Sequence, residues 1–312
     1  MSEPSKPLYW FSNLLYSAQY QTLIAGVAGG ATSTLGLHPL DVVKIRLQVS
    51  ETHSGKEREV YTNMRDAFKK IWRAKGISGF YQGVSPNLVG ATASWGLYFF
   101  FYNTIKTSAL SAQTAPLSLS QNLSFAALSG VATLTLTNPI WVVKTRMVLQ
   151  ANKPSTRRGL HGNYKGLSDG LYKLAKTEGL QGLYSGYIPG LFGVSHGAIQ
   201  FVSYEILKNY YYEQMEYEKS VKLNPLPYIL FSATSKLLAV SITYPYQVVR
   251  SRLQEADSKF TGTWDVVRRT AAHEGFAGFY KGVVPNLIRV IPACCITFLM
   301  YENVVHYLSK GL

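Results

Sequence analysis

The stretch Pro39-Leu-Asp41-Val-Val-Lys44-Ile-Arg46 contains a proline followed by one basic residue five positions later and another seven positions later. The same pattern recurs twice, as Pro139-Ile-Trp141-Val-Val-Lys144-Thr-Arg146 and as Pro245-Tyr-Gln247-Val-Val-Arg250-Ser-Arg252. The three prolines are separated by 100 and then 106 residues. Repetition at such a period indicates that the chain consists of three copies of one structural unit.

A glycine-rich block follows each proline motif at a similar distance. The blocks run from Gly76 to Gly83, from Gly179 to Gly186 and from Gly275 to Gly282. After each block comes a proline and then an apolar segment that ends in a tyrosine. Each unit is therefore an apolar segment, a basic loop and a second apolar segment. We expect an N-terminal tail over residues 1–18 and three repeats over residues 19–110, 118–215 and 222–310.

Six stretches almost free of charge are about long enough to cross a bilayer as helices, which requires ~20 residues. They lie at residues 23–37, 84–105, 123–143, 188–207, 229–249 and 283–305. Small residues in them lower hydropathy but allow close helix packing, and Gly26 and Gly30 lie one turn apart in the first stretch. We predict an all-α membrane protein with six transmembrane helices in three pseudo-threefold repeats. A soluble array of buried helices is the alternative.

The net charge of +14 raises the question of nucleic-acid binding, so the positions of the 31 basic residues matter. Six of them end the odd-numbered stretches, and seventeen more lie in the loops 56–75, 153–176 and 259–281. Such asymmetry is typical of the positive-inside rule for membrane proteins. We expect these loops on the inner side, both termini on the outer side, and no nucleic-acid partner.

The first unit illustrates the plan of all three. A helix from about Gln19 to Gln48 is interrupted by a proline, which removes an internal hydrogen bond and kinks the helix. We expect such kinks at Pro39, Pro139 and Pro245. Apolar residues at helical spacing from Met64 to Trp72 alternate with basic ones, which predicts a short amphipathic helix on the membrane surface. The adjacent Cys294 and Cys295 are too few for a metal framework and read as small apolar packing residues.

These motifs resemble those of the mitochondrial carrier family over about residues 21–306. The resemblance implies a six-helix bundle around a central cavity, three surface helices on the matrix side, and a monomeric solute carrier of the inner mitochondrial membrane. Both termini would then face the intermembrane space. It also implies membrane lipid, notably cardiolipin, at the matrix-side helix ends.

Departures from the family pattern narrow the expected cargo. Trp141 and Gln247 stand where the family usually has acidic residues, and with the segments 95–103 and 289–298 they resemble the branch that carries FAD or folate. Another nucleotide-like cofactor, such as NAD, CoA or a pyrimidine nucleotide, is an alternative, and so is a peroxisomal location. A carrier-fold receptor or scaffold that transports nothing is a third hypothesis. The sequence contains no motif for a nucleophile with its base or a metal cluster, so we expect no enzyme, no catalytic cofactor and no metal.

A carrier must close one end of its cavity while the other is open. The family pattern pairs the acidic position of one repeat with the basic position of the next, which implies three contacts at the matrix end. These are Asp41 with Lys144, Trp141 with Arg250, and Gln247 with Lys44. The first is an ion pair, the second a cation–π contact worth ~0.5–2 kcal/mol, and the third a hydrogen bond. Arg46, Arg146 and Arg252 are better suited to anchoring at lipid phosphates.

The family also has a gate at the outer end. Its pattern is an aromatic residue, an acidic residue directly after it, and a basic residue three positions after the acidic one. Its members here are Asn103, Lys106, Glu205, Lys208 and Glu302. Glu302 with Lys106 would be an ion pair, and Asn103 with Lys208 a hydrogen bond. We therefore expect modest gates at both ends.

Ionisable residues in the middle of a membrane helix are costly and are treated as functional by default. Arg289 and Lys236 lie within such helices, and a planar guanidinium suits phosphate or carboxylate. A tether to a backbone carbonyl is the alternative for each. The family's contact points correspond here to Gly90-Ala91 and Phe192-Gly193, where the glycines would leave room for a large ligand. Aromatic candidates for stacking against it are Phe192 and His196, followed by Trp95.

Overall fold

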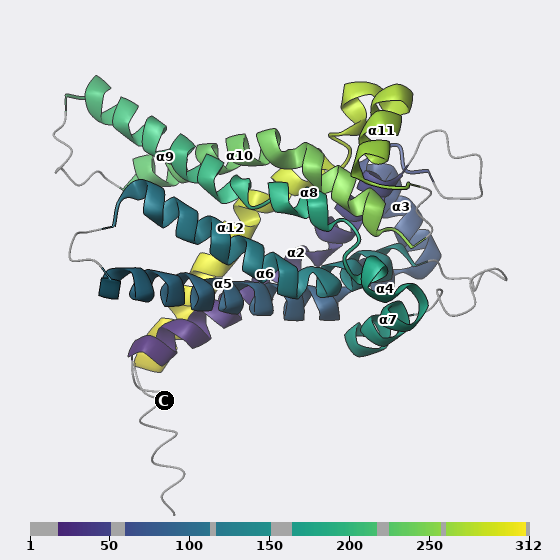
Figure 1. The fold of residues 1–312 in the computed structure, drawn as a ribbon, viewed down its shortest axis with the longest axis horizontal. Coiled ribbons are helices and arrows are strands. Elements are labelled where there is room, and N and C mark those ends of the chain that lie inside the picture. Colours follow the sequence, from purple (N-terminus) through teal and green to yellow (C-terminus); the bar gives the residue numbers. More distant parts are fainter. Residues whose placement is uncertain are drawn as a thin grey trace, which may run out of the picture.

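The computed structural model describes residues 18–50, 60–112, 117–150, 164–216, 225–256 and 260–309, and every regular element in these ranges is a helix (Figure 1). The long helices are α2 (Ala18–Val49), α5 (Val84–Ala112), α6 (Leu119–Leu149), α9 (Ser195–Gln214), α10 (Pro225–Gln254) and α12 (Val283–Ser309). The shorter ones are α3 (Met64–Lys75), α4 (Ile77–Phe80), α7 (Leu167–Leu183), α8 (Tyr187–Phe192) and α11 (Thr263–Gly278). The predicted six long segments, with a short helix after each odd one, are confirmed.

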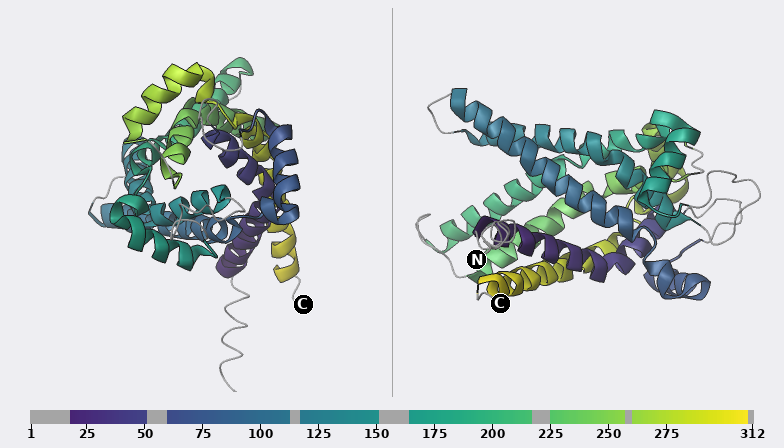
Figure 2. Two further views of the ribbon diagram at one scale, coloured as in Figure 1. Left: turned by 90° about the vertical axis from the view of Figure 1, so that its right-hand side faces the viewer. Right: turned by 90° about the horizontal axis from the view of Figure 1, so that it is seen from below.

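The long helices form a ring when the bundle is viewed end on (Figure 2, left). Helix α2 packs along α12, α5 along α6, and α9 along α10, so the lengthwise contacts join neighbouring repeats. Helices α3, α7 and α11 lie at one end, which we call the motif end because the basic residues of the proline motifs lie there (Figures 1 and 2). Helix α2 begins and α12 ends at the opposite end, which we call the terminal end.

Hydropathy alone identifies only part of this arrangement. Within the described ranges, residues Ser120–Leu149 and Leu226–Gln254 are long and apolar enough to cross a membrane. The bent pair Thr263–Gly278 and Val283–Thr297 adds at most a third span. Glycine, serine and threonine dilute the apolar content of the other long helices. The repeat pattern therefore identifies helices that hydropathy misses.

Each motif proline lies inside its helix and is preceded by a fully buried polar side chain. These side chains hydrogen-bond to backbone carbonyls of the glycine-rich block. The bonds join His38 Nε2 to Gln82 O (2.9 Å), Asn138 Nδ2 to Leu183 O (2.9 Å) and Tyr244 Oη to Lys281 O (3.1 Å). The residue before each proline therefore fixes the loop against the helix.

The buried core lies at the motif end, between the surface helices and the long helices α2, α6 and α10 that contain the proline motifs. The paired valines of every motif are 0–4% exposed: Val42, Val43, Val142, Val143, Val248 and Val249. In the first two repeats they pack with Ile71 of α3 and Leu174 of α7. Full burial of one such side chain contributes ~1.5–3 kcal/mol.

The three surface helices begin with the same arrangement of charges. An aspartate in the third position accepts a hydrogen bond from a backbone N–H just before the helix and pairs with a basic residue four positions later at 2.8 Å. The ion pairs are Asp66–Lys70, Asp169–Lys173 and Asp265–Arg269. These bonds favour the ionised carboxylates and hold the pKa of each aspartate below its ordinary value.

Three details of the fold differ from expectation. The close approach of α2 to α12 uses Gly29, because a Cβ added there would lie 2.8 Å from Thr297 O, whereas Gly26 and Gly30 face open space. Cys295 is exposed and does not pack in a core, and the side chain of Cys294 lies outside the described residues. The fourth long segment is divided into α8 and α9 at Gly193 and Val194, where backbone N–H groups bond to carbonyls three residues back in tighter turns and Ser195 Oγ bonds Phe192 O (2.6 Å).

Candidate functional site

Three arginines form a closed cycle across the motif end. Each Nε atom donates to a backbone carbonyl at the end of the motif-bearing long helix (α2, α6 or α10) of the next repeat. The bonds are Arg46 to Val148 O (3.3 Å), Arg146 to Gln254 O (3.1 Å) and Arg252 to Gln48 O (3.1 Å). Since Arg146 and Arg252 are only 3% and 2% exposed, the expectation that these two anchor at lipid phosphates is wrong.

The cycle is tied to two surface helices by ion pairs. Arg146 holds the Glu178 carboxylate through both terminal nitrogens. Arg252 pairs with Glu274 at 2.6 Å, and Glu274 also pairs with Lys281 at 3.0 Å. These pairs fix α7 and α11 to the ends of α6 and α10.

Beside the arginine cycle, the carboxylate of Asp41 lies among several basic side chains. Asp41 is 5% exposed, and its Oδ1 lies 3.0 Å from Nη1 of Arg289 on α12. Its Oδ2 accepts a hydrogen bond from Asn87 at 3.4 Å. The expected partner Lys144 also acts on the Asp41 charge through space, as does Lys44. The prediction of an Asp41–Lys144 ion pair is wrong, because α12 packs lengthwise against α2 and its long guanidinium reaches the carboxylate first.

The predicted contact between the first and third repeats is confirmed. Lys44 Nζ donates to Gln247 Oε1 at 2.7 Å, and it also donates to Asn286 Oδ1 at 2.8 Å. The contact between the second and third repeats differs from the prediction. Lys144, three residues along the same helix, lies over the Trp141 ring at 5.0 Å, and Arg250 donates to Asn138 Oδ1 at 3.1 Å.

These residues make a cluster with an excess of positive charge. It contains Asp41, Lys44, Lys144, Arg250 and Arg289, so four cations accompany one carboxylate. The Nε atom of Arg289 is buried and has no hydrogen-bond partner among the described residues. A buried guanidinium edge without an acceptor is costly. The cluster is therefore suited to binding an anion.

The remaining predicted binding residues divide into two groups. His196 Nδ1 lies 3.0 Å from Thr243 Oγ1, and both Lys236 and Lys44 act on its ring electrostatically, so α9 and α10 bring these groups near the cluster. Trp95 and Phe192 are each 64% exposed, and Trp95 stacks on Phe99. No contact places these two aromatics at the cluster within the described chain.

The two glycines expected to leave room for a ligand are covered by neighbouring side chains. A Cβ added to Gly90 would lie 3.1 Å from Ile140 and 3.5 Å from Trp141. A Cβ added to Gly193 would lie 2.8 Å from the Tyr246 hydroxyl. That expectation is wrong, because these positions serve close helix packing; Ala91, next to Gly90, is half-buried.

At the terminal end, the described ion pairing stays within one helix. Lys208 lies 3.9 Å from Glu205 of the same helix, and Lys106 lies over the Tyr102 ring at 5.7 Å. Asn103 is exposed, and the side chain of Glu302 lies outside the described residues. The motif end is therefore tied between repeats, whereas the described gate residues of the terminal end are not.

Sequence reasoning missed the asparagines of this site. Asn87 and Asn286 each follow the proline after a glycine-rich block, and they bond to Asp41 and Lys44. That repeated position could have identified them.

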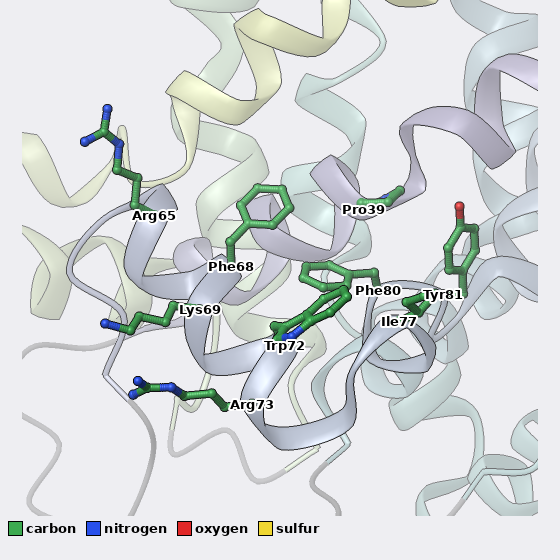
Figure 3. A pocket seen from close by; sticks show the side chains of 9 residues that line it. All are labelled: Pro39, Arg65, Phe68, Lys69, Trp72, Arg73, Ile77, Phe80 and Tyr81. Atoms are coloured by element: carbon green, nitrogen blue, oxygen red, sulfur yellow. The ribbon is translucent and has the colours of Figure 1, made fainter.

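A separate cavity of about 680 Å³ lies outside the ring, between α3, α4 and Pro39 of α2 (Figure 3). Apolar and aromatic side chains form most of its lining: Phe68, Trp72, Ile77, Phe80 and Tyr81. Arg65, Lys69 and Arg73 supply positive charge along one side (Figure 3).

Comparisons with known proteins agree with this architecture. Residues 17–112, 115–215 and 221–312 each match the family described as Mitochondrial carrier protein. The chain is 39% identical to folate transporter 1, chloroplastic, of Arabidopsis thaliana, covering 94% of this chain and 97% of the relative. It is 35% identical to the mitochondrial FAD carrier protein of Saccharomyces cerevisiae, covering 92% and 96%. It is 37% identical to nicotinamide adenine dinucleotide transporter 1, chloroplastic, of Arabidopsis thaliana, covering 91% and 90%. The chain therefore belongs to the mitochondrial carrier family, whose members are transporters.

Proposed function

We propose that this protein moves FAD or folate across the mitochondrial inner membrane by alternating access, as a monomer. The observation that carries the proposal is the state of Arg289, which binds Asp41 through Nη1 and leaves a buried Nε without a partner in the described chain. A guanidinium binds a carboxylate or phosphate through two parallel hydrogen bonds. FAD offers phosphates and folate offers carboxylates, and both carry a fused ring system.

The surroundings of Arg289 favour an anionic substrate. Lys44 and Lys144 lie beside the same carboxylate, and Lys236 and His196 extend the polar region onto α9 and α10. Ionisable groups within membrane helices are costly to bury, and they commonly mark the path of a substrate.

In this proposal, the motif end is the matrix gate in its closed state, which is supported by its contacts between repeats. The terminal end would be the gate toward the intermembrane space, on the side where both termini would lie. Because the closed gate would contain a single carboxylate, the free-energy difference between the inward-closed and inward-open conformations should stay within a few kcal/mol. Alternating access requires such a small difference.

The similarity to a folate transporter and to an FAD carrier supports this choice of substrate. A nicotinamide dinucleotide is the second candidate, because a transporter of that cofactor shares 37% identity with this chain.

The decisive experiment uses the purified full-length chain in liposomes, with uptake of labelled FAD, folate, NAD and UTP measured side by side. We expect saturable uptake of FAD or folate whose kcat/KM falls about 10–100-fold in Arg289→Gln and is retained in Asp66→Asn, a change on the surface helix α3. Saturable NAD uptake with no FAD or folate signal would favour the second candidate. No uptake of any of the four would overturn the proposal of cofactor transport.

We also propose that an anionic membrane phospholipid, such as cardiolipin, occupies the cavity in Figure 3. Trp72 and Phe80 present apolar surface to an acyl chain, and Arg73 is placed for its phosphate. Native mass spectrometry of Arg73→Gln should show weaker retention of cardiolipin than the parent chain, and equal retention would contradict this site.

A further inference from the structure

The three repeats differ at one position of the cycle that joins them. Glu178 and Glu274 precede the first glycine of their blocks and pair with Arg146 and Arg252. In the first repeat this position is Lys75. The charge is therefore reversed where the other two repeats have their ion pair.

The backbone places all three side chains alike. A Cβ added to Gly79, Gly182 or Gly278, the glycine four residues later in each repeat, would collide with the Cβ of Lys75, Glu178 or Glu274. The glycine before each short return helix also has the same conformation, with φ of 58°, 63° and 62° at Gly76, Gly179 and Gly275. Lys75 therefore starts from the same place as the two glutamates.

Arg46 keeps its place in the cycle although no carboxylate among the described residues pairs with it. Its terminal nitrogens donate to Tyr61 Oη (3.0 Å) and to Gln82 Oε1 (2.9 Å), both neutral groups. A guanidinium has five N–H donors, and these bonds together with that to Val148 O use three. Two donors remain for another acceptor.

Lys75 lies close enough to Arg46 to interact with its charge. Burial, and then the positive charge of Arg46, lower the pKa of the Lys75 ammonium below its ordinary value. No carboxylate pairs with either side chain among the described residues. In the third repeat, by comparison, the Glu274 carboxylate lies between Arg252 and Lys281. The first repeat thus has two adjacent cations at the point where its counterparts have an acid.

We propose that a phosphate-type oxyanion binds between Arg46 and Lys75 and takes the place that the carboxylates of Glu178 and Glu274 occupy in the other repeats. The bound anion joins α2 to α3, as the ion pairs of Glu178 and Glu274 join α6 to α7 and α10 to α11. It thereby stabilises the closed motif end. The oxyanion is either the headgroup of a phospholipid or free inorganic phosphate.

The test measures thermal unfolding of the purified full-length chain in detergent. Inorganic phosphate should raise the Tm by about 2–4 °C over chloride at the same ionic strength. In Lys75→Glu, the Tm without phosphate should be higher and the phosphate increment should disappear, because the chain then supplies the acid itself. Lys75→Gln should lose most of the increment without gaining the higher starting Tm.

A second arm identifies the source of the oxyanion. Mixed micelles containing phosphatidylglycerol are compared with micelles containing phosphatidylcholine for the same three chains. An increment in this arm that depends on Lys75 assigns a lipid headgroup, and one in the phosphate arm alone assigns free phosphate. An equal increment in the parent chain and in both variants would place the anion elsewhere and overturn the proposal. No increment in either arm would overturn it as well.

Discussion

Asp41 and Arg289 form an ion pair with 3.0 Å between Oδ1 and Nη1, which joins α2 to α12. Asp41 is the one acidic residue that the three proline motifs retain. Its carboxylate is engaged by the residue that we propose to bind an anionic substrate, so the proposed matrix gate and the proposed substrate site share one guanidinium.

Replacement of Arg289 by glutamine should lower kcat/KM for uptake by about 10–100-fold, because charge-assisted hydrogen bonds contribute ~1.5–3 kcal/mol each. Arg289→Lys keeps the charge but loses the planar fork, so it should recover only part of the activity. Uptake into liposomes measures both variants. Activity of Arg289→Gln equal to that of the parent chain would exclude Arg289 from the substrate site.

Replacement of Asp41 by asparagine should destabilise the motif end by ~1–3 kcal/mol. The loss is smaller than for a fully buried pair, because Arg289 remains 33% exposed. Thermal unfolding of Asp41→Asn, Arg289→Gln and the double variant forms a cycle whose coupling energy should be ~0.5–3 kcal/mol. Additive effects would show that the ion pair contributes nothing. We also expect altered transport by Asp41→Asn, and unchanged uptake would count against its role in the gate.

The arginine cycle should be more sensitive in the third repeat than in the first. Arg252 is 2% exposed and pairs with a carboxylate, so Arg252→Gln should cost ~3–5 kcal/mol. Arg46→Gln should cost ~1–2 kcal/mol, because its side-chain partners are neutral and it is half-buried. Thermal unfolding in phosphate-free buffer compares the two variants. A larger loss for Arg46→Gln would contradict this ranking.

Close packing of α2 on α12 should depend on Gly29. A methyl group there would meet Thr297 O at 2.8 Å, so Gly29→Ala should destabilise the protein by ~1–3 kcal/mol. Gly26→Ala is the matched control, since nothing lies within 4 Å of its added Cβ. Thermal unfolding should leave the control near the parent value, and equal losses in both variants would refute the packing argument.

Acidification should break the tie between α10 and α11. Burial raises the pKa of Glu274, but Arg252 and Lys281 together hold it below the ordinary 4.5. A carboxylate with a depressed folded-state pKa stabilises the protein fully above its unfolded pKa, and that stability is lost as pH falls through the lower folded value. Unfolding curves from pH 7 to pH 3 should show this step in the parent chain. Glu274→Gln should lack it, and an identical profile would refute the assignment.

Much of the fold could be predicted from repetition. The proline motifs and glycine-rich blocks placed the helices Ala18–Val49 and Met64–Lys75 within a few residues of their observed bounds. Hydropathy alone would have identified only part of the membrane region, because its helices are rich in small polar residues. The break between α8 and α9 was missed, although Gly193 lies at it and Pro189 and Gly190 lie just before it.

Contacts across the site were predicted less well. Lys44 with Gln247 was correct because threefold repetition relates equivalent helix ends. Asp41 with Lys144 was wrong, and so was Trp141 with Arg250, because the outcome depends on which side chain reaches a shared partner first. The glycines at 90 and 193 were read as space for a ligand, yet Trp141 and Tyr246 cover them.

The sequence by itself determined the threefold architecture, the asymmetry of positive charge and the loss of two acidic positions, since all three are properties of residue order. Only the tertiary structure showed that Arg289 pairs with Asp41 and that three arginines form a closed cycle around the motif end. It also showed that Lys75 occupies the position at which two glutamates form ion pairs in the other repeats. The Asp41–Arg289 pair and the bonds of the arginine cycle join residues more than a hundred positions apart, and the ion pairs of Glu178 and Glu274 join residues of different helices. They follow from how the helices pack, and packing is a property of the whole bundle.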